Sequence, residues 1–112
     1  MSVIAKSLFP PNQAPNANTT QYTANGVRCI IDKFTGTNTT AGAVSLTVFL
    51  VPNAGAAGVT NTIVSARSLA AGECYTFPEV VGHVLNAGDF LVTLASAAAS
   101  ITVRGSGREV SG

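Results

Sequence analysis

One stretch indicates the fold class most clearly: Val44-Ser45-Leu46-Thr47-Val48-Phe49-Leu50-Val51. Alternate side chains of a strand point to opposite faces, so the four even-numbered aliphatic residues share one face, while Ser45 and Thr47 begin the other. Phe49 and Val51 then make both faces apolar near the end of the stretch. The pattern predicts a β-strand with one buried side. It also indicates a second contact at Phe49 and Val51, either with the chain's own core or with a neighbouring subunit.

The same pattern continues on both sides of this stretch. Short runs of β-branched and aromatic residues are separated by Gly, Asn, Pro and Ala turns, about ten residues apart. The expected strands are Gln21–Ala24, Val27–Thr35, Val44–Val51, Thr62–Ser68, Glu73–Phe77, Gly82–Leu85, Asp89–Ala95 and Ser100–Arg104, with Arg108–Val110 as a further candidate. The expected turns include Gly55–Gly58, Ser96–Ala99 and Gly105–Gly107. This spacing predicts an all-β, jelly-roll-like sandwich of about eight strands, with an immunoglobulin-like sandwich as the alternative.

The N-terminal residues are expected to differ from the rest of the chain. Residues 1–20 read as an extended arm and a Pro/Asn-rich linker, and residues 21–112 as the sandwich domain. The linker from Pro10 to Thr20 holds three prolines and three asparagines, which exclude a helix and favour an extended path. Two interpretations stay open: an arm that lies on a neighbouring subunit, or an ordinary first strand followed by a long loop.

The charge content is low. Only 10% of residues are Asp, Glu, Lys or Arg, against about 25% in a typical soluble domain. A surface of Thr, Ser, Asn, Gly and Ala suits burial against neighbouring subunits, although a monomer with an uncharged polar coat would have the same composition. The residues expected to make assembly contacts are Val3, Ile4, Leu8, Phe9, Phe49 and Val51.

Several partners and compartments are not supported. The six basic residues are scattered along the sequence, so nucleic-acid binding is not supported, because phosphate contacts need a basic patch. Folding could still bring Arg104 and Arg108 near another basic side chain. No apolar run is long enough for a membrane span, and no signal sequence begins the chain, so assembly in a cytoplasm is expected. Cys29 and Cys74 are expected as free buried thiols.

The sequence offers little material for catalysis. His83 is the single histidine, the two cysteines are far apart in sequence, and the five acidic residues are isolated. Proton transfer, nucleophilic attack and metal binding each need several such groups in one pocket. The sequence therefore predicts no enzyme: no catalytic residue, metal, cofactor or small-molecule substrate. Arg28, Asp32, Arg67 and Glu73 are expected at strand ends, in ion pairs between strands or between subunits.

Three stretches carry a resemblance to a known family: residues 30–40, residues 48–52 and residues 71–85. They resemble small virion proteins of tailed bacteriophages that decorate or cement a capsid. The resemblance covers roughly residues 27–110, and it is weakest in the proposed arm, Ser2 to Thr20. It implies a jelly-roll subunit of the virion, often a homotrimer, that binds the outer surface of an icosahedral shell and clamps adjacent major capsid proteins. It brings no catalytic residues.

Two other functions are compatible with the sequence. A phage neck or tail connector, or a fibre component, would keep the structural role with a different symmetry. A lectin-like module that binds a glycan or a receptor would use Tyr22 and Tyr75 to stack on sugar rings.

Overall fold

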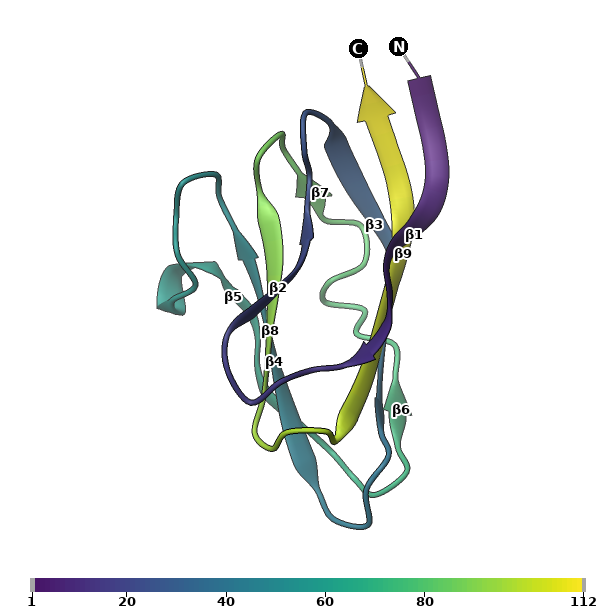
Figure 1. Ribbon diagram of the computed structural model, residues 1–112, viewed down its shortest axis with the longest axis vertical. Coiled ribbons are helices and arrows are strands. Elements are labelled where there is room, and N and C mark those ends of the chain that lie inside the picture. The colour runs from purple at the N-terminus through teal and green to yellow at the C-terminus, as the bar shows by residue number, and fades with distance from the viewer. Residues whose placement is uncertain (1, 112) are drawn as a thin grey trace.

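Two antiparallel β-sheets packed face to face make up the computed structural model, which describes residues 2–111 (Figure 1). Sheet A has the order β1 (Ser2–Gln13), β9 (Ile101–Ser111) and β3 (Arg28–Asn38), with the short strands β6 (Cys74–Tyr75) and β7 (Val84–Leu85) on the far side of β3. Sheet B has the order β2 (Thr19–Thr23), β8 (Phe90–Ala95), β4 (Val44–Val51) and β5 (Thr62–Leu69). The predicted all-β, jelly-roll-like sandwich is therefore confirmed.

Helical structure is minor. A single 3-10 turn, η1 (Val59–Asn61), lies between β4 and β5. Over residues 2–111, no helix has the length and apolar character needed to cross a membrane.

The core lies between the two sheets and is centred on aromatic rings. The Phe34 ring meets the Phe77 ring edge-on, with 5.2 Å between centroids, and lies 6.1 Å from the ring of Phe9. All three side chains are buried, and large aromatic side chains contribute strongly to core stability. Asn38 is a buried polar residue of this region, and its side-chain Nδ2 donates to the backbone carbonyl oxygens of Leu69 and Gly42. Its hydrogen bonds offset the cost of burial.

Strand β1 occupies the place that the sequence analysis considered for an extended arm. Residues 2–13 pair with β9, and Leu8, Phe9 and Ala14 are buried in the core. The chain then crosses from sheet A to sheet B, where the amide of Ala95 donates to the carbonyl oxygen of Pro15. Residues 2–20 thus share a core with the rest of the chain, because Leu8 and Phe9 fill one side of it. This arrangement agrees with the first strand of the second interpretation but not with its long loop, because β1 extends to Gln13 and β2 begins at Thr19.

The Gly105–Gly107 segment was predicted to be a turn, and this prediction is wrong. These residues continue β9 without a break, from Ile101 to Ser111. A Cβ atom at Gly105 would lie 2.6 Å from the Phe9 ring, and one at Gly107 would collide with the Ile30 carbonyl oxygen. The glycines serve close packing between neighbouring strands rather than chain reversal.

Strands β6 and β7 are shorter than predicted. Only Cys74–Tyr75 and Val84–Leu85 pair with β3. The residues between them form a loop that directs Phe77 and Val80 into the core, where both are fully buried. The apolar run in this region therefore reflects a core-packing loop as well as strands.

Candidate assembly surfaces

The six predicted contact residues fall into two groups. Val3 and Ile4 are 56% and 55% exposed. Leu8 and Phe9 lie in the main core, and Phe49 and Val51 are also buried. Of the predicted set, only the first pair is accessible to a partner.

Phe49 and Val51 belong to a second apolar cluster on the outer face of sheet B. Phe49 pairs with Val92 across β4 and β8, and Phe90, Leu94 and Ala57 pack around them. Ala57 lies in the loop between β4 and β5, so the chain covers this cluster partly with its own residues. The second contact indicated by the sequence is therefore made within the chain.

The segment Ser2–Ser7 of β1 is exposed along its whole length, and we call it the edge segment. It pairs with β9 on one side only, since β1 is the first strand in the order of sheet A. Figure 1 shows no strand of residues 2–111 beside β1 on its other side, so the backbone N–H and C=O groups there are not paired in the sheet. An edge of this kind can pair with another strand.

The outer face of sheet A follows from strand alternation. Val103, Gly105 and Gly107 of β9 are buried against the core, so the residues between them, Arg104 among them, point outward. Across the β3–β9 ladder, Arg28 lies opposite Val110, Ile30 opposite Arg108, Lys33 opposite Ser106 and Thr35 opposite Arg104. A register shift between Ile31 and Lys33 brings Lys33 to the same face.

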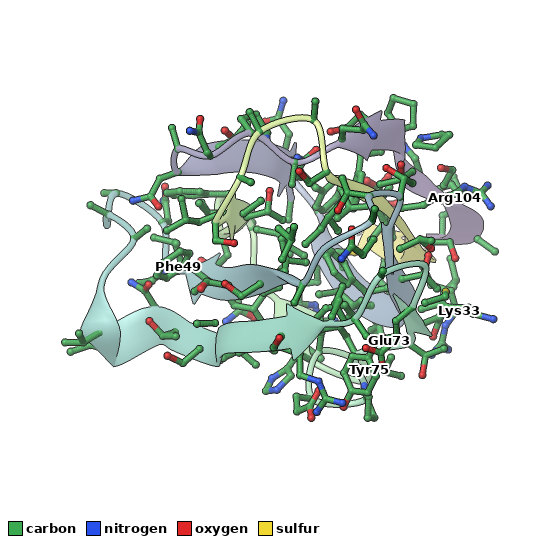
Figure 2. All side chains as sticks on the ribbon, turned by 90° about the horizontal axis from the view of Figure 1, so that it is seen from below. Lys33, Phe49, Glu73, Tyr75 and Arg104 are labelled. Atoms are coloured by element: carbon green, nitrogen blue, oxygen red, sulfur yellow. The ribbon has the colours of Figure 1, made fainter. Side chains whose placement is uncertain are left out.

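This outer face carries most of the chain's positive charge, and we call it the basic face. It holds Arg28, Lys33, Arg104 and Arg108, four of the six basic residues, together with Asp32. Four positive charges and one negative charge give a net charge of +3. Figure 2 shows Lys33 and Arg104 on the same side of the molecule, far from Phe49. Basic residues that are scattered in sequence are thus gathered in space, because neighbouring strands place them on one face.

Asp32 and Arg108 form a bidentate ion pair on this face. Arg108 donates from Nε to Oδ2 at 3.0 Å and from Nη2 to Oδ1 at 2.9 Å. The hydrogen bonds to Asp32, together with its charge, raise the pKa of Arg108. The predicted ion pair of Asp32 therefore exists, but its partner is Arg108. Along the β3–β9 ladder, the pair lies between Arg28 and Lys33.

At one end of the sandwich, polar groups join the two sheets. The Tyr22 hydroxyl of β2 donates to Glu109 of β9, and the Lys6 ammonium lies 3.4 Å from the same carboxylate. Burial and the hydrogen bond to Glu109 raise the pKa of Tyr22. Burial also raises the pKa of the neighbouring Cys29 thiol, which makes this cysteine less reactive.

A second polar contact joins β5 to the β6 side of sheet A. The Arg67 guanidinium lies 3.9 Å above the centroid of the Tyr75 ring, and the Tyr75 hydroxyl donates to Glu79 at 2.9 Å. The hydrogen bond with Glu79 raises the pKa of Tyr75. Figure 2 shows Tyr75 beside Glu73, whose carboxylate accepts a hydrogen bond from the amide of Ala70. The inter-strand ion pairs considered for Arg67 and Glu73 are absent among residues 2–111, and pairs between subunits stay a prediction.

The residue types that commonly bind metal ions are dispersed in the described part of the chain. Within it, no cluster of three or more His, Cys, Asp or Glu side chains could hold a metal ion. His83 is exposed in the loop before β7. Cys29 is a free buried thiol as predicted, but Cys74 is exposed, because it lies on the outer side of the short strand β6.

Comparisons with known proteins give a likeness in fold. No family model matches the chain, and no curated protein is similar to it in sequence. A chain in the structure of the Gx strain of infectious bursal disease virus matches with a TM-score of 0.61 at 17% identity, over 98% of this chain and 32% of the viral one. A chain in the structure of the Gt strain matches with a TM-score of 0.57 at 15% identity, over 98% of this chain and 33% of the viral one. This chain therefore spans about a third of the length of its structural neighbours, and at such identity the likeness shows the fold alone.

Proposed function

We propose that this chain is a structural, non-enzymatic protein of a virion, and more specifically a decoration or cement subunit that binds the outside of a phage head shell. The observation that carries the proposal is the pair of open surfaces, the edge segment and the basic face, on a sandwich with little other charge. Two further findings support it: the structural neighbours come from structures of a virus, and three sequence stretches resemble phage decoration proteins.

The mechanism would be physical. Each subunit would contact the major capsid protein and copies of itself, as a homotrimer, and would need no cofactor. The subunits would assemble on the shell in the host cytoplasm. Many weak contacts repeated over a shell give a strong total attachment, because each bound subunit raises the effective concentration of the next contact. Val3 and Ile4 of the edge segment are the apolar groups open to a neighbour.

A lectin-like function receives less support from the side chains. One face of the Tyr75 ring is covered by Arg67, and Tyr22 is buried with its hydroxyl bonded to Glu109. The two tyrosines on which that hypothesis depends are thus already engaged. A glycan array with the isolated protein would test the point, and selective binding would favour this alternative.

The proposal is tested by deleting residues 2–7 and measuring how much protein binds to particles that lack it. This deletion keeps Leu8 and Phe9, which the core requires. We expect a folded protein with strongly reduced occupancy. Unchanged occupancy would remove the edge segment from the mechanism.

Counting copies on native particles separates the structural roles. Hundreds of copies per particle would fit a shell protein, whereas about six or twelve would indicate a connector or a fibre component. A chain missing from purified virions would contradict the proposal as a whole.

A further inference from the structure

We propose that the basic face is the docking face of this protein, and that its partner is a protein surface rich in Asp and Glu. This inference rests on the proposed virion function and assigns the contact with the shell to one side of the sandwich.

The basic residues of the chain differ in whether a carboxylate lies beside them. Lys6 is bonded to Glu109 and Arg67 lies on Tyr75, so both basic residues outside the basic face have partners. On the basic face, Asp32 pairs with Arg108. Arg28, Lys33 and Arg104 are exposed and have no carboxylate partner among residues 2–111. Arg67 also lacks a carboxylate partner within this range, so three of the four basic residues without one lie on this face.

Two of the unpaired cations on the basic face are close to each other. Lys33 lies opposite Ser106 and Arg104 opposite Thr35, so the two side chains are diagonal neighbours on adjacent strands, with Cα atoms about 7–8 Å apart. Like charges at this spacing repel each other. A facing carboxylate would remove the repulsion and add a charge-assisted hydrogen bond, which Arg favours for its planar geometry.

The shape of the face favours a protein over a nucleic acid. The four adjacent strands β1, β9, β3 and β7 measure about 14 Å across. This width is too large for the major groove of B-DNA, which is about 12 Å wide. The residues paired along β3 and β9 on this side offer no aromatic ring on which a base could stack. Ile30, Val84 and Val110 add apolar contact area between the charges. This mixture of Arg and aliphatic side chains is typical of protein interfaces.

The size of the face is also suitable. Strands β3 and β9 each have 11 residues, which corresponds to a length of about 35 Å. With a width of about 14 Å, the outer face of the sheet measures about 500 Å² as a flat rectangle. Protruding side chains make its accessible area larger than this, and a standard interface buries roughly 800 Å² per partner. Sheet B gives less scope for such a contact, since its outer cluster is partly covered by the chain itself.

The test compares two variants with the same change of charge on different surfaces. Arg104→Glu reverses a charge on the basic face, and Arg67→Glu reverses one at the edge of sheet B. Both residues are exposed, and circular dichroism would verify that both variants fold. Binding is measured to particles that lack the protein, and to immobilised poly-L-glutamate and duplex DNA.

We expect Arg104→Glu to weaken particle binding by about tenfold or more, with Arg67→Glu close to wild type, and we expect wild-type binding to weaken as salt is added. Equal binding by both variants would overturn the docking face while leaving the virion function intact. Preference for DNA over poly-L-glutamate would overturn the acidic protein partner. Failure of the wild type to bind particles would instead contradict the proposed function.

Discussion

The outer faces of the two sheets differ in what covers them. On sheet B, Phe49, Val51 and Val92 make an apolar cluster, and a loop of the same chain helps to cover it. On sheet A, the outer positions carry Arg104 and Arg108, which remain exposed. Apolar groups on an outer face need cover, which the chain supplies from nearby sequence, whereas charged groups are stable in water and stay open for a partner. A low overall charge therefore coexists with one strongly basic face.

The largest effect is expected from Gly107→Ala, which places a methyl group between β9 and β3 of sheet A. The added methyl group would meet the Ile30 carbonyl oxygen, a backbone atom that cannot move without disturbing the β3–β9 ladder. We expect a loss of about 3 kcal/mol or more in the free energy of unfolding, measured by urea denaturation. Gly42→Ala is the matched control, since a Cβ there meets nothing within 4 Å. Equal stability of both variants would contradict the close packing of β9 on β3.

Phe49→Ala tests whether the outer cluster of sheet B is part of the protein's own core. We expect a loss of about 2–4 kcal/mol, because a buried ring is removed and a cavity is left. Val59→Ala, at a position that is 93% exposed, should change stability by less than about 0.5 kcal/mol. If Phe49→Ala were equally mild, the cluster would be an open surface, and the contrast between the two faces would fail.

Tyr22→Phe tests the polar contact that joins the sheets. Loss of the hydrogen bond to Glu109 should cost about 1–2 kcal/mol at neutral pH. The raised pKa of Tyr22 means that its contribution is complete below the ordinary tyrosine pKa of about 10 and is lost as the pH rises through the raised value. Denaturation at a series of alkaline pH values should show a steeper loss for the wild type than for Tyr22→Phe. Parallel curves would contradict this.

The smallest effect on stability is expected in the edge segment. Val3→Ser with Ile4→Ser should change the free energy of unfolding by less than about 0.5 kcal/mol, because both side chains are exposed. Self-association, measured by sedimentation velocity, should nevertheless decrease. A large loss of stability would show that the segment belongs to the core, as Leu8 and Phe9 do.

Local pattern predicted much of the fold. Strand β4 has the bounds expected from its alternation, Val44–Val51, because alternation depends only on adjacent residues. The continuous strand β9 was missed because Gly105 and Gly107 resemble turn residues until their neighbours, Phe9 and Ile30, are known. A local sequence pattern does not predict which distant residues will be in contact.

The candidate surfaces depend even more on distant contacts. Lys33 and Arg104 are far apart in sequence, and only the pairing of β3 with β9 brings them to one face. Leu8 and Phe9 were predicted to contact a neighbouring subunit, because nothing in the sequence of residues 3–9 indicates which of their side chains enter the core. This run is in fact divided, with exposed residues before Leu8 and buried residues from it onward.

The central claim is that one side of this sandwich is made for a partner and the other is completed by the chain itself. A cryo-EM reconstruction of the virion that carries the protein tests it directly. The account predicts subunits on the shell with Lys33 and Arg104 facing acidic residues of the major capsid protein, and with the outer face of sheet B toward solvent. Subunits that meet the shell through sheet B, with the basic face exposed, would contradict it.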